Sequence, residues 1–530
     1  MTCVDGSMLS FMNKQKKSLI IHPFLLSIFP IIALFSSNVR ELSFQEMFLP
    51  MVLILSFTTG IWILLRYILK NGRKSAFIIS LSLVLFFSYG YLYNLIDNVT
   101  IAGFDIGRSR YLLVPYLVTL VVGIYYFVRT NRKLNNVTTI TNSIAISLIL
   151  IVSINIGTFY MMNDDNFYKD EALQNSFPDI EDTQMGFAKL DNNNLPDVYY
   201  IVLDGYAGIN SLKEFLGFDN QEFVTFLKNQ GFYVPQQSFS NYPVTPSSMA
   251  ATLNMQYVNH LSDIVGTDLD NMHPTFTVIQ ENLVMKKFKS KGYTLIGFGT
   301  DVVHLNESKK FDFHYCENKT LLNNKLVNTI LHQSIIGYFI EKVSYKEQRD
   351  AILCAFSKLP EIKNIDGPTF LYAHFNMPHS PYIFSADGEP LDPARKSNLG
   401  SSDDIDSYIN YLKFTNKKIE KLVEQLLETD ELPIIIIQSD HGSGFGLDWE
   451  NPTDDMLRQK MSNFQAIYFP NVNNDLVSKA TTPVNIFRIL FNSYFNENYE
   501  ILSDKIFWNT WTKPYDFKDI TDLLIVKKSE

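Results

Sequence analysis

The residues best suited to chemistry in this chain are an aspartate and a histidine that stand side by side after an apolar run. Asp440 and His441 follow Leu432–Ser439, in which four successive isoleucines predict a buried strand. In an open α/β sheet, ligands bind beyond the carboxyl-terminal ends of the strands. A carboxylate and an imidazole at that place form a pair of metal ligands, and Gly442 lets the backbone turn away. Taken alone, the same residues also fit an ordinary solvated turn.

A second apolar run ends in the same way. Leu195–Leu203 reads as a buried strand, and it is followed directly by Asp204 and Gly205. Because parallel strands end at the same edge of a sheet, Asp204 is expected near Asp440.

Thr245 stands where a helix is expected to begin. Proline favours the first position of a helix, so Thr245, just before Pro246, is predicted to be the N-cap residue. A hydroxyl there faces free backbone N–H groups and the positive end of the helix dipole, where a phosphate or sulfate is best held. An ordinary capping role is the alternative.

Three histidines are candidates for contact with a substrate. A third strand delivers His374 into a proline-rich loop that carries His379, five residues later. His379 is predicted to stabilise a transferring group or to protonate a leaving oxygen. His374 could approach the same site or be a core histidine of the strand. His304 follows Gly299–Asp301 and could reach the substrate from another strand end.

The first four of these groups make a ligand set of oxygen and nitrogen atoms. Asp204, Thr245, Asp440 and His441 are predicted to bind one divalent ion, Mn²⁺ or Zn²⁺. Such an ion lowers the pKa of a hydroxyl nucleophile and neutralises charge on a phosphoryl group.

The elements that must position these residues alternate between strand-like and helix-like runs. Lys213–Leu227 is predicted to be an amphipathic helix, Lys291–Gly299 a strand and Tyr408–Leu427 a strong helix. This alternation predicts an α/β domain over 195–530 with a mostly parallel sheet flanked by helices. The polar, Asn-rich stretch 164–194 is interpreted as a linker.

In order and spacing, these motifs resemble the alkaline phosphatase/sulfatase superfamily over about 195–470. The nearest relatives look like its membrane-anchored members, lipoteichoic acid synthase and phosphoethanolamine transferases. The resemblance implies an alkaline-phosphatase-like fold, metal ligation by the two aspartates and His441, Thr245 as nucleophile, and substrate contact from the loop His379-Ser380-Pro381.

The chain also departs from this superfamily in three ways. Those membrane-anchored relatives usually carry glutamate where Asp204 stands. No histidine follows His441, so the two-metal site of alkaline phosphatases is not expected. The stretch Val244–Ser248 lacks the cysteine and arginine of the formylglycine motif of sulfatases, which argues against true sulfatase chemistry.

Five apolar runs precede the domain, each close to the roughly 20 residues needed to cross a bilayer. They predict a transmembrane region over residues 1–163, with spans at Leu19–Phe35, Met47–Leu65, Ala76–Ile96, Tyr111–Val128 and Ile144–Met161. The first is the weakest because it contains His22, Pro23 and Pro30; a signal sequence is the alternative, but no small-residue cleavage site follows.

Loop charges predict the orientation of these spans. Ten lysines and arginines lie before the first span, between the second and third, and between the fourth and fifth, whereas the other two loops hold three. The positive-inside rule then places the N-terminus in the cytoplasm. An odd number of spans puts the catalytic domain outside a bacterial-type cell membrane.

Charge also limits the partners. Residues 1–163 contain 13 basic and 5 acidic residues, which leaves 32 basic and 50 acidic residues in the rest of the chain. A net charge of −18 there argues against nucleic acid as a partner. Cys316 and Cys354 both lie outside the membrane in this topology, and a disulfide between them is left open by their spacing.

The reaction predicted is transfer of phosphoglycerol or phosphoethanolamine from a phospholipid donor to a surface glycan or lipid, through a phospho-threonine. A sulfatase-like phosphodiesterase or hydrolase of surface phosphoesters or sulfate esters is the first alternative. A membrane assembly protein with a degenerate enzyme domain is the second. The membrane tether favours the transferase because it keeps the site near lipid donors.

Overall fold

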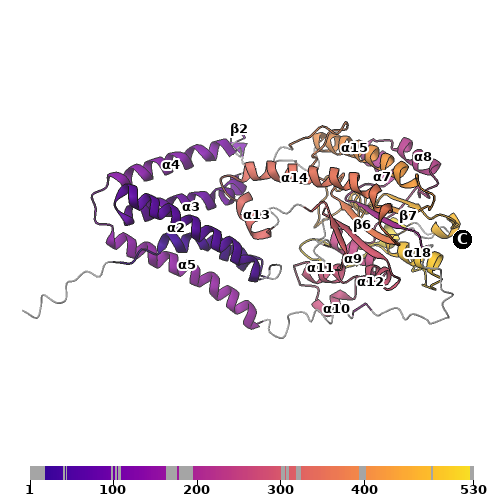
Figure 1. The fold of residues 1–530 in the computed structure, drawn as a ribbon, viewed down its shortest axis with the longest axis horizontal. Coiled ribbons are helices and arrows are strands. Elements are labelled where there is room, and N and C mark those ends of the chain that lie inside the picture. Colours follow the sequence, from indigo (N-terminus) through magenta and orange to yellow (C-terminus); the bar gives the residue numbers. More distant parts are fainter. Residues whose placement is uncertain are drawn as a thin grey trace, which may run out of the picture. The chain divides into compact units, whose positions relative to one another are not determined.

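A computed structural model of the chain describes most of residues 18–525. The stretches outside the description within this range are 40–41, 43, 97–99, 102–103, 106–108, 163–172, 174–175, 178–194, 300–304, 306–309, 318–323, 393–401 and 479–481. The chain divides into two compact units (Figure 1). The first comprises Met1–Asp165 and Lys319–Ser344, and the second comprises Asn166–Asn318 and Tyr345–Glu530.

The first unit is built around five apolar helices. They are α1 (His22–Ser37), α2 (Phe48–Leu69), α3 (Gly72–Ile96), α4 (Ser109–Arg129) and α5 (Asn135–Met162). Among the described residues, four helices, α2 to α5, are long and apolar enough to cross a membrane. The prediction of spans is therefore supported for these four, whereas α1 has only 16 residues and is shorter than a span.

The short length of α1 has a local cause at its first turn. The side-chain oxygen of Asn142, from α5, accepts hydrogen bonds from the backbone N–H of His22 at 3.0 Å and of Ile21 at 3.3 Å. Pro23 occupies the first turn, where its missing N–H costs nothing. The helix therefore begins at His22 and not at Leu19, where the predicted span begins.

The second unit contains a six-stranded sheet in the order β5-β4-β6-β3-β7-β8. The strands are β3 (Val198–Leu203), β4 (Thr294–Phe298), β5 (Phe313–Tyr315), β6 (Thr369–Phe375), β7 (Ile434–Gln438) and β8 (Gln465–Tyr468). Every pairing is parallel except that of β8 with β7. This confirms the predicted α/β fold with a mostly parallel sheet.

Both faces of this sheet are buried, and each belongs to its own hydrophobic core. Along β3, Val198, Tyr200 and Val202 join one core, while Tyr199, Ile201 and Leu203 join the other. The first core is covered by helices that include α9 (Thr245–Asn254), α12 (Leu283–Ser290) and α18 (Ile486–Phe495). The second is covered by helices that include α7 (Ile209–Leu216), α8 (Gln221–Asn229) and α15 (Ser402–Leu427), as Figure 1 shows. Burial on both faces explains why these strands are continuous apolar runs.

Two predicted elements differ from the structure. The helix expected over 213–227 is two helices, α7 and α8, because Gly217 takes a left-handed conformation with φ of 65° and ends the first. In the predicted linker, Leu173 is fully buried in the first core of the second unit, so part of that stretch packs on the domain.

Cys316 and Cys354 form a disulfide, with their Cα atoms 5.8 Å apart. Cys316 follows β5, and Cys354 lies on α14 (Gly337–Lys358). The bridge therefore closes a loop of 38 residues. This loop contains Lys319–Ser344, the segment that belongs to the first unit.

Candidate functional site

The register of three neighbouring strands brings the two predicted aspartates to one edge of the sheet. Leu203 of β3 pairs with Phe375 of β6, and Val202 pairs with Gln438 of β7. Continuing this register puts Asp204, one residue beyond β3, at the same level as Asp440, two residues beyond β7. The N–H of Gly205 donates to Asp440 Oδ1 at 3.1 Å, which ties the two strand ends together.

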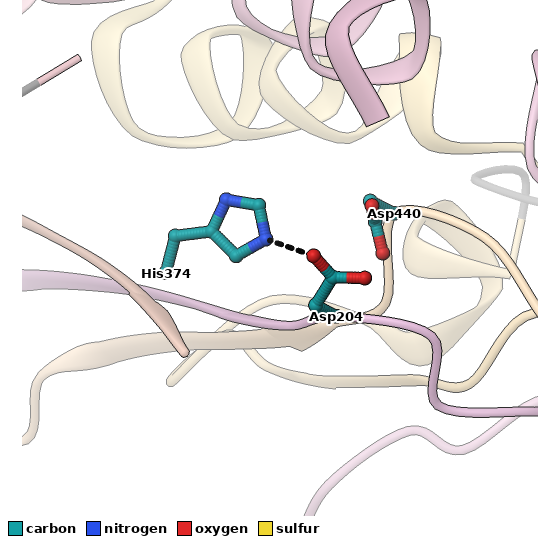
Figure 2. Close-up of side chains that lie close together, drawn as sticks. All are labelled: Asp204, His374 and Asp440. Carbon is teal, nitrogen blue, oxygen red and sulfur yellow. Dashed lines mark ion pairs between the residues drawn. The ribbon is translucent and has the colours of Figure 1, made fainter. Parts of the chain in front are cut away.

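Asp204, His374 and Asp440 form a cluster with the spacing of metal ligands (Figure 2). One ligand atom of each lies within 4.8 Å of the others, and all three residues are buried. His374 Nε2 lies 3.7 Å from Asp204 Oδ2, and the Tyr372 hydroxyl lies 3.2 Å from His374 Nδ1. The structure thus directs the fully buried His374 at the carboxylates and not at the surface where a substrate would bind.

His441 approaches the same carboxylates from the other side. Its Nε2 lies 3.7 Å from Asp204 Oδ1 and 3.4 Å from Asp440 Oδ2. Thr245 Oγ1 lies 3.2 Å from the same nitrogen. The four ligands predicted from the sequence are therefore brought together, and His374 joins them.

Two unsatisfied oxygens indicate that these residues fit a cation. Asp204 Oδ1 and Asp440 Oδ2 are buried and have no hydrogen-bond partner among the described residues. A buried carboxylate oxygen is costly unless it is hydrogen-bonded, paired or bound to a metal. The donor set of carboxylates, imidazoles and a hydroxyl suits Zn²⁺ or Mn²⁺.

The electrostatics of the two carboxylates point the same way. Burial raises the pKa of Asp204 well above its usual value, and the nearby charge of Asp440 raises it further. Burial also acts on Asp440, but the neighbouring histidines and hydrogen bonds from Thr245 and Gly205 outweigh it and lower the pKa to about 2. A divalent ion between the carboxylates would reverse their mutual repulsion and let both ionise.

His441 is held in a form that can ligate a metal. Burial lowers the pKa of its ring to about 3, so the ring is neutral at neutral pH. Its Nδ1 lies 2.9 Å from the Gly442 carbonyl and 3.0 Å from the ammonium of Lys460. A proton on Nδ1 that is donated to the carbonyl leaves the lone pair of Nε2 facing Asp204 and Asp440. A cation at Nε2 favours this tautomer over the one in which Lys460 donates to Nδ1.

Thr245 is buried at the start of α9. The prediction that it is the N-cap residue is wrong, because it is the first residue of the helix. Val244 takes the cap position, with extended backbone angles. Pro246 follows within the first turn, so the helix begins one residue earlier than the proline rule placed it. The hydroxyl of Ser248, one turn on, donates to the Asp440 carbonyl at 2.7 Å and fixes α9 against the metal ligands.

The remaining predicted histidines have different outcomes. His379 is exposed, and its ring centroid lies 6.2 Å from that of His441. Its backbone N–H donates to the Asp204 carbonyl at 3.1 Å, so its loop is anchored beside the metal ligands. A Cβ on Gly205 would lie 3.1 Å from the His379 ring. His304 lies outside the described residues, so its predicted contact with the substrate stays a prediction.

Lys460 is a member of the site that the sequence did not reveal. It lies on α16 (Asp454–Met461), its side chain is buried, and its ammonium contacts His441. Burial lowers its pKa to about 8, although Asp440 and Asp204 pull the pKa upward. No local pattern around Lys460 distinguishes it from the other charged residues of this helix.

Gly442 is needed for close packing with α16. Its N–H donates to the Lys460 carbonyl at 2.8 Å, and a Cβ at this position would lie 2.3 Å from the carbonyl oxygens of Gln459 and Ser462. The glycine therefore allows the Asp-His-Gly loop and the end of α16 to meet, which brings Lys460 to His441.

Comparison with known families gives a match over part of the chain. Residues 217–461 match the family model described as Sulfatase. Over these residues the chain carries a sulfatase-family domain. The matched range of this sulfatase-family domain includes Thr245, His374, Asp440 and His441, while Asp204 lies just before it. No curated protein matches the chain.

Solved structures with low sequence identity resemble the chain. The C-terminal periplasmic domain of EptC from Escherichia coli has 14% identity and a TM-score of 0.41, with 63% of this chain and 95% of that one covered. The integral membrane lipooligosaccharide phosphoethanolamine transferase A from Neisseria meningitidis has 12% identity and a TM-score of 0.39, with 88% and 92% covered. The sulfatase yidJ from Bacteroides fragilis has 13% identity and a TM-score of 0.36, with 62% and 83% covered.

Proposed function

We propose that the chain is a membrane-anchored, metal-dependent transferase that moves phosphoglycerol or phosphoethanolamine from a phospholipid to a surface glycan or lipid. The observation that carries this proposal is the position of Thr245. Its hydroxyl lies 3.2 Å from His441 Nε2, at the start of a buried helix and beside two carboxylates with unsatisfied oxygens. A hydroxyl nucleophile next to a cation site is the arrangement that phosphoryl transfer requires.

The groups that would hold the ion are Asp204, Asp440, His441 and Thr245, with His374 either as a further ligand or as the group that orients Asp204. When bound, a divalent ion there lowers the pKa of the threonine hydroxyl and offsets the negative charge of the phosphoryl group. Because Asp204 stands between His374 and His441, its orientation is set from both sides.

The chain's own residues supply the rest of the first step. The Thr245 hydroxyl loses its proton to solvent, its oxygen forms a bond to phosphorus, and the bond from phosphorus to the diacylglycerol oxygen breaks. In this proposal His379, whose ring centroid lies 6.2 Å from that of His441, gives the leaving oxygen its proton. The N-terminal N–H groups of α9 and the ammonium of Lys460 stabilise the charge on the phosphoryl oxygens. In the second step an acceptor hydroxyl takes the group from Thr245.

A hydrolase remains the second candidate, and the sulfatase family model favours it. It would use the same phospho-threonine with water as the acceptor. The formylglycine motif is absent, since Val244 and Thr245 stand in a stretch without cysteine. Phosphoesters are therefore better substrates than sulfate esters for this site.

Mass spectrometry of the Thr245 peptide tests the proposal. Full-length protein in phospholipid vesicles is incubated with head-group-labelled lipid and quenched in acid. A phosphoglycerol or phosphoethanolamine adduct on Thr245 is expected, together with released diacylglycerol. Appearance of free head-group phosphate without an acceptor product would favour the hydrolase.

Matched variants sharpen this experiment. Thr245→Ala should abolish the adduct, whereas Thr252→Ala removes a hydroxyl from the same buried helix and should retain it. The Thr252 hydroxyl donates to the Ser248 carbonyl at 2.9 Å, within α9. If Thr245→Ala keeps full activity, Thr245 is not the nucleophile.

A further inference from the structure

A segment of the chain between two parts of the catalytic domain belongs to the compact unit of membrane helices. This segment, Lys319–Ser344, contains α13 (Lys325–His332) and the first two turns of α14. Leu326 of α13 is 1% exposed and packs with Ile31, Phe35 and Met47 in the core of the first unit. The segment is therefore built into the helical bundle and is not a surface loop of the catalytic domain.

The turn between α13 and α14 is bonded through its main chain to α3. The N–H of Gly90 donates to the Gln333 carbonyl at 2.9 Å, and the N–H of Ile335 donates to the Phe86 carbonyl at 3.2 Å. A Cβ on Gly90 would lie 2.2 Å from the Gln333 oxygen, so this approach requires the glycine. Gly90 lies six residues before the end of α3, which is roughly 9 Å along the helix axis.

This position corresponds to an interfacial level of the bilayer. Ile335 packs on a cluster of three tyrosines, Tyr89, Tyr93 and Tyr116, from α3 and α4. Tyrosines gather where a membrane helix leaves the hydrocarbon for the head groups. In the orientation predicted from the loop charges, this end of α3 faces outward.

The first two turns of α14 and the residue just before the helix carry an apolar stripe that is exposed in the structure. Ile336 is 36% exposed, Phe339 66% and Val343 46%, and their spacing of three and four residues places them on one face. All three residues of the stripe lie within Lys319–Ser344. Beyond Ser344 the exposed side chains of Lys346 and Asp350 form an ion pair at 2.8 Å.

We propose that the first two turns of α14 lie in the outer leaflet of the membrane and that the stripe of Ile336, Phe339 and Val343 binds lipid acyl chains. The occupant is assigned by continuity, because the same unit has exposed apolar residues on α2, α4 and α5, which are long and apolar enough to cross a membrane. A helix with one apolar face, bonded to a membrane helix at the level of its tyrosines, fits an interfacial position. This inference rests on the membrane helices and not on the proposed reaction.

Spin-label accessibility in lipid nanodiscs tests the proposal with the full-length chain. Cys3→Ser removes the one cysteine outside the disulfide. Single variants Phe339→Cys and Val343→Cys are then labelled with a nitroxide, and collision with oxygen is compared with collision with a water-soluble nickel chelate. Labels in the stripe should favour oxygen and exclude the chelate, and so should a label at the exposed Val122 of the candidate span α4, which serves as the positive control.

The matched control is Lys346→Cys, on the same helix beyond the stripe, where the chelate should have free access. Chelate access at 339 and 343 equal to that at 346 would overturn the proposal, since the stripe would then face water. Labels inaccessible to both reagents would also overturn it, because the stripe would then pack against protein. If one variant does not fold, Ile336→Cys provides the second position on the same face.

Discussion

Asp204 and Asp440 present buried side-chain oxygens that no hydrogen bond satisfies among the described residues. Such atoms are tolerated at a cation site and are expensive elsewhere. The surrounding imidazoles and the threonine hydroxyl complete a set of donors, and each is fixed by an element that enters from a different part of the chain. The side chains at this site therefore suit a cation.

Asp440→Asn should remove the metal together with the activity. The substitution keeps the size of the side chain and deletes its charge, so the affinity for Mn²⁺ or Zn²⁺ should fall more than about 100-fold, beyond the loss typical of outer ligands. Elemental analysis of the dialysed protein measures it, with the surface variant Asp312→Asn as control. Full metal content in Asp440→Asn, or two tightly bound ions in the unaltered protein, would contradict the single site.

His374→Ala should lower the affinity for the metal by about 10–100-fold, which is the usual effect of losing a group that orients or completes a ligand set. Its Nε2 lies 3.7 Å from Asp204 and it is fully buried, so it can either complete the ligand set or orient the carboxylate. His260→Ala is a matched control, because His260 is partly buried and bonds to the Tyr257 carbonyl outside the site. Equal metal affinities in the two variants would assign His374 to the core alone.

Lys460→Met should lower kcat/KM by about 10²–10³-fold and leave the metal in place, since it removes a charge that stabilises the transferring group and not a ligand. Lys417→Met, which breaks an exposed pair with Asp387, is the control and should change neither quantity. Metal loss in Lys460→Met would show that the lysine mainly supports His441.

At the scale of elements, parallel strands β3, β6 and β7 end at one level, and α9 and α16 bring Thr245 and Lys460 to that level. Two glycines let the strand ends pack closely against neighbouring segments. Gly205 has a φ of 67°, which favours glycine, and Gly442 leaves room for three carbonyl oxygens of α16 and its end. The strands and helices therefore set the distances between the side chains of the site.

The disulfide is an element-scale feature with a measurable effect on stability. Replacing Cys316 and Cys354 by serine opens a closed loop of 38 residues. The chain-entropy relation predicts a loss of about 4 kcal/mol in the free energy of unfolding. Denaturant unfolding of the detergent-solubilised double variant measures it, with Cys3→Ser as control. Labelling of both cysteines in unreduced protein would show that the bridge does not form.

For the whole molecule, the number of membrane crossings would set the side of the membrane on which the sulfatase-family domain lies. In the part of the chain that the structure describes, four helices are long enough to span and α1 is shorter, so the number of crossings depends on whether α1 spans. The loop charges predict a cytoplasmic N-terminus and an external catalytic domain.

Reporter fusions test this topology. A reporter that is active only outside should be active after Asp97 and after Asn163, and silent after Arg73. A cytoplasmic reporter should give the opposite pattern. Activity of the cytoplasmic reporter after Asn163 would place the sulfatase-family domain inside and remove the lipid-facing role proposed for α14.

Several features followed from sequence alone because their signals are local. Apolar runs that end in an aspartate predicted β3 and β7 and the positions of Asp204 and Asp440, and a proline placed the start of α9 within one residue. The apolar runs of α2 to α5 predicted their helices for the same reason, since length and composition decide whether a segment suits the bilayer.

Other features depended on contacts between distant residues. The face on which His374 lies, the approach of Lys460 to His441 and the pairing of Cys316 with Cys354 join segments whose local patterns do not point to one another. The membership of Lys319–Ser344 in the membrane unit depends on hydrogen bonds to α3, more than two hundred residues earlier in the chain. Strand ends and apolar lengths are encoded within a few residues, whereas the partner of a buried polar group is chosen by the packing of the whole fold.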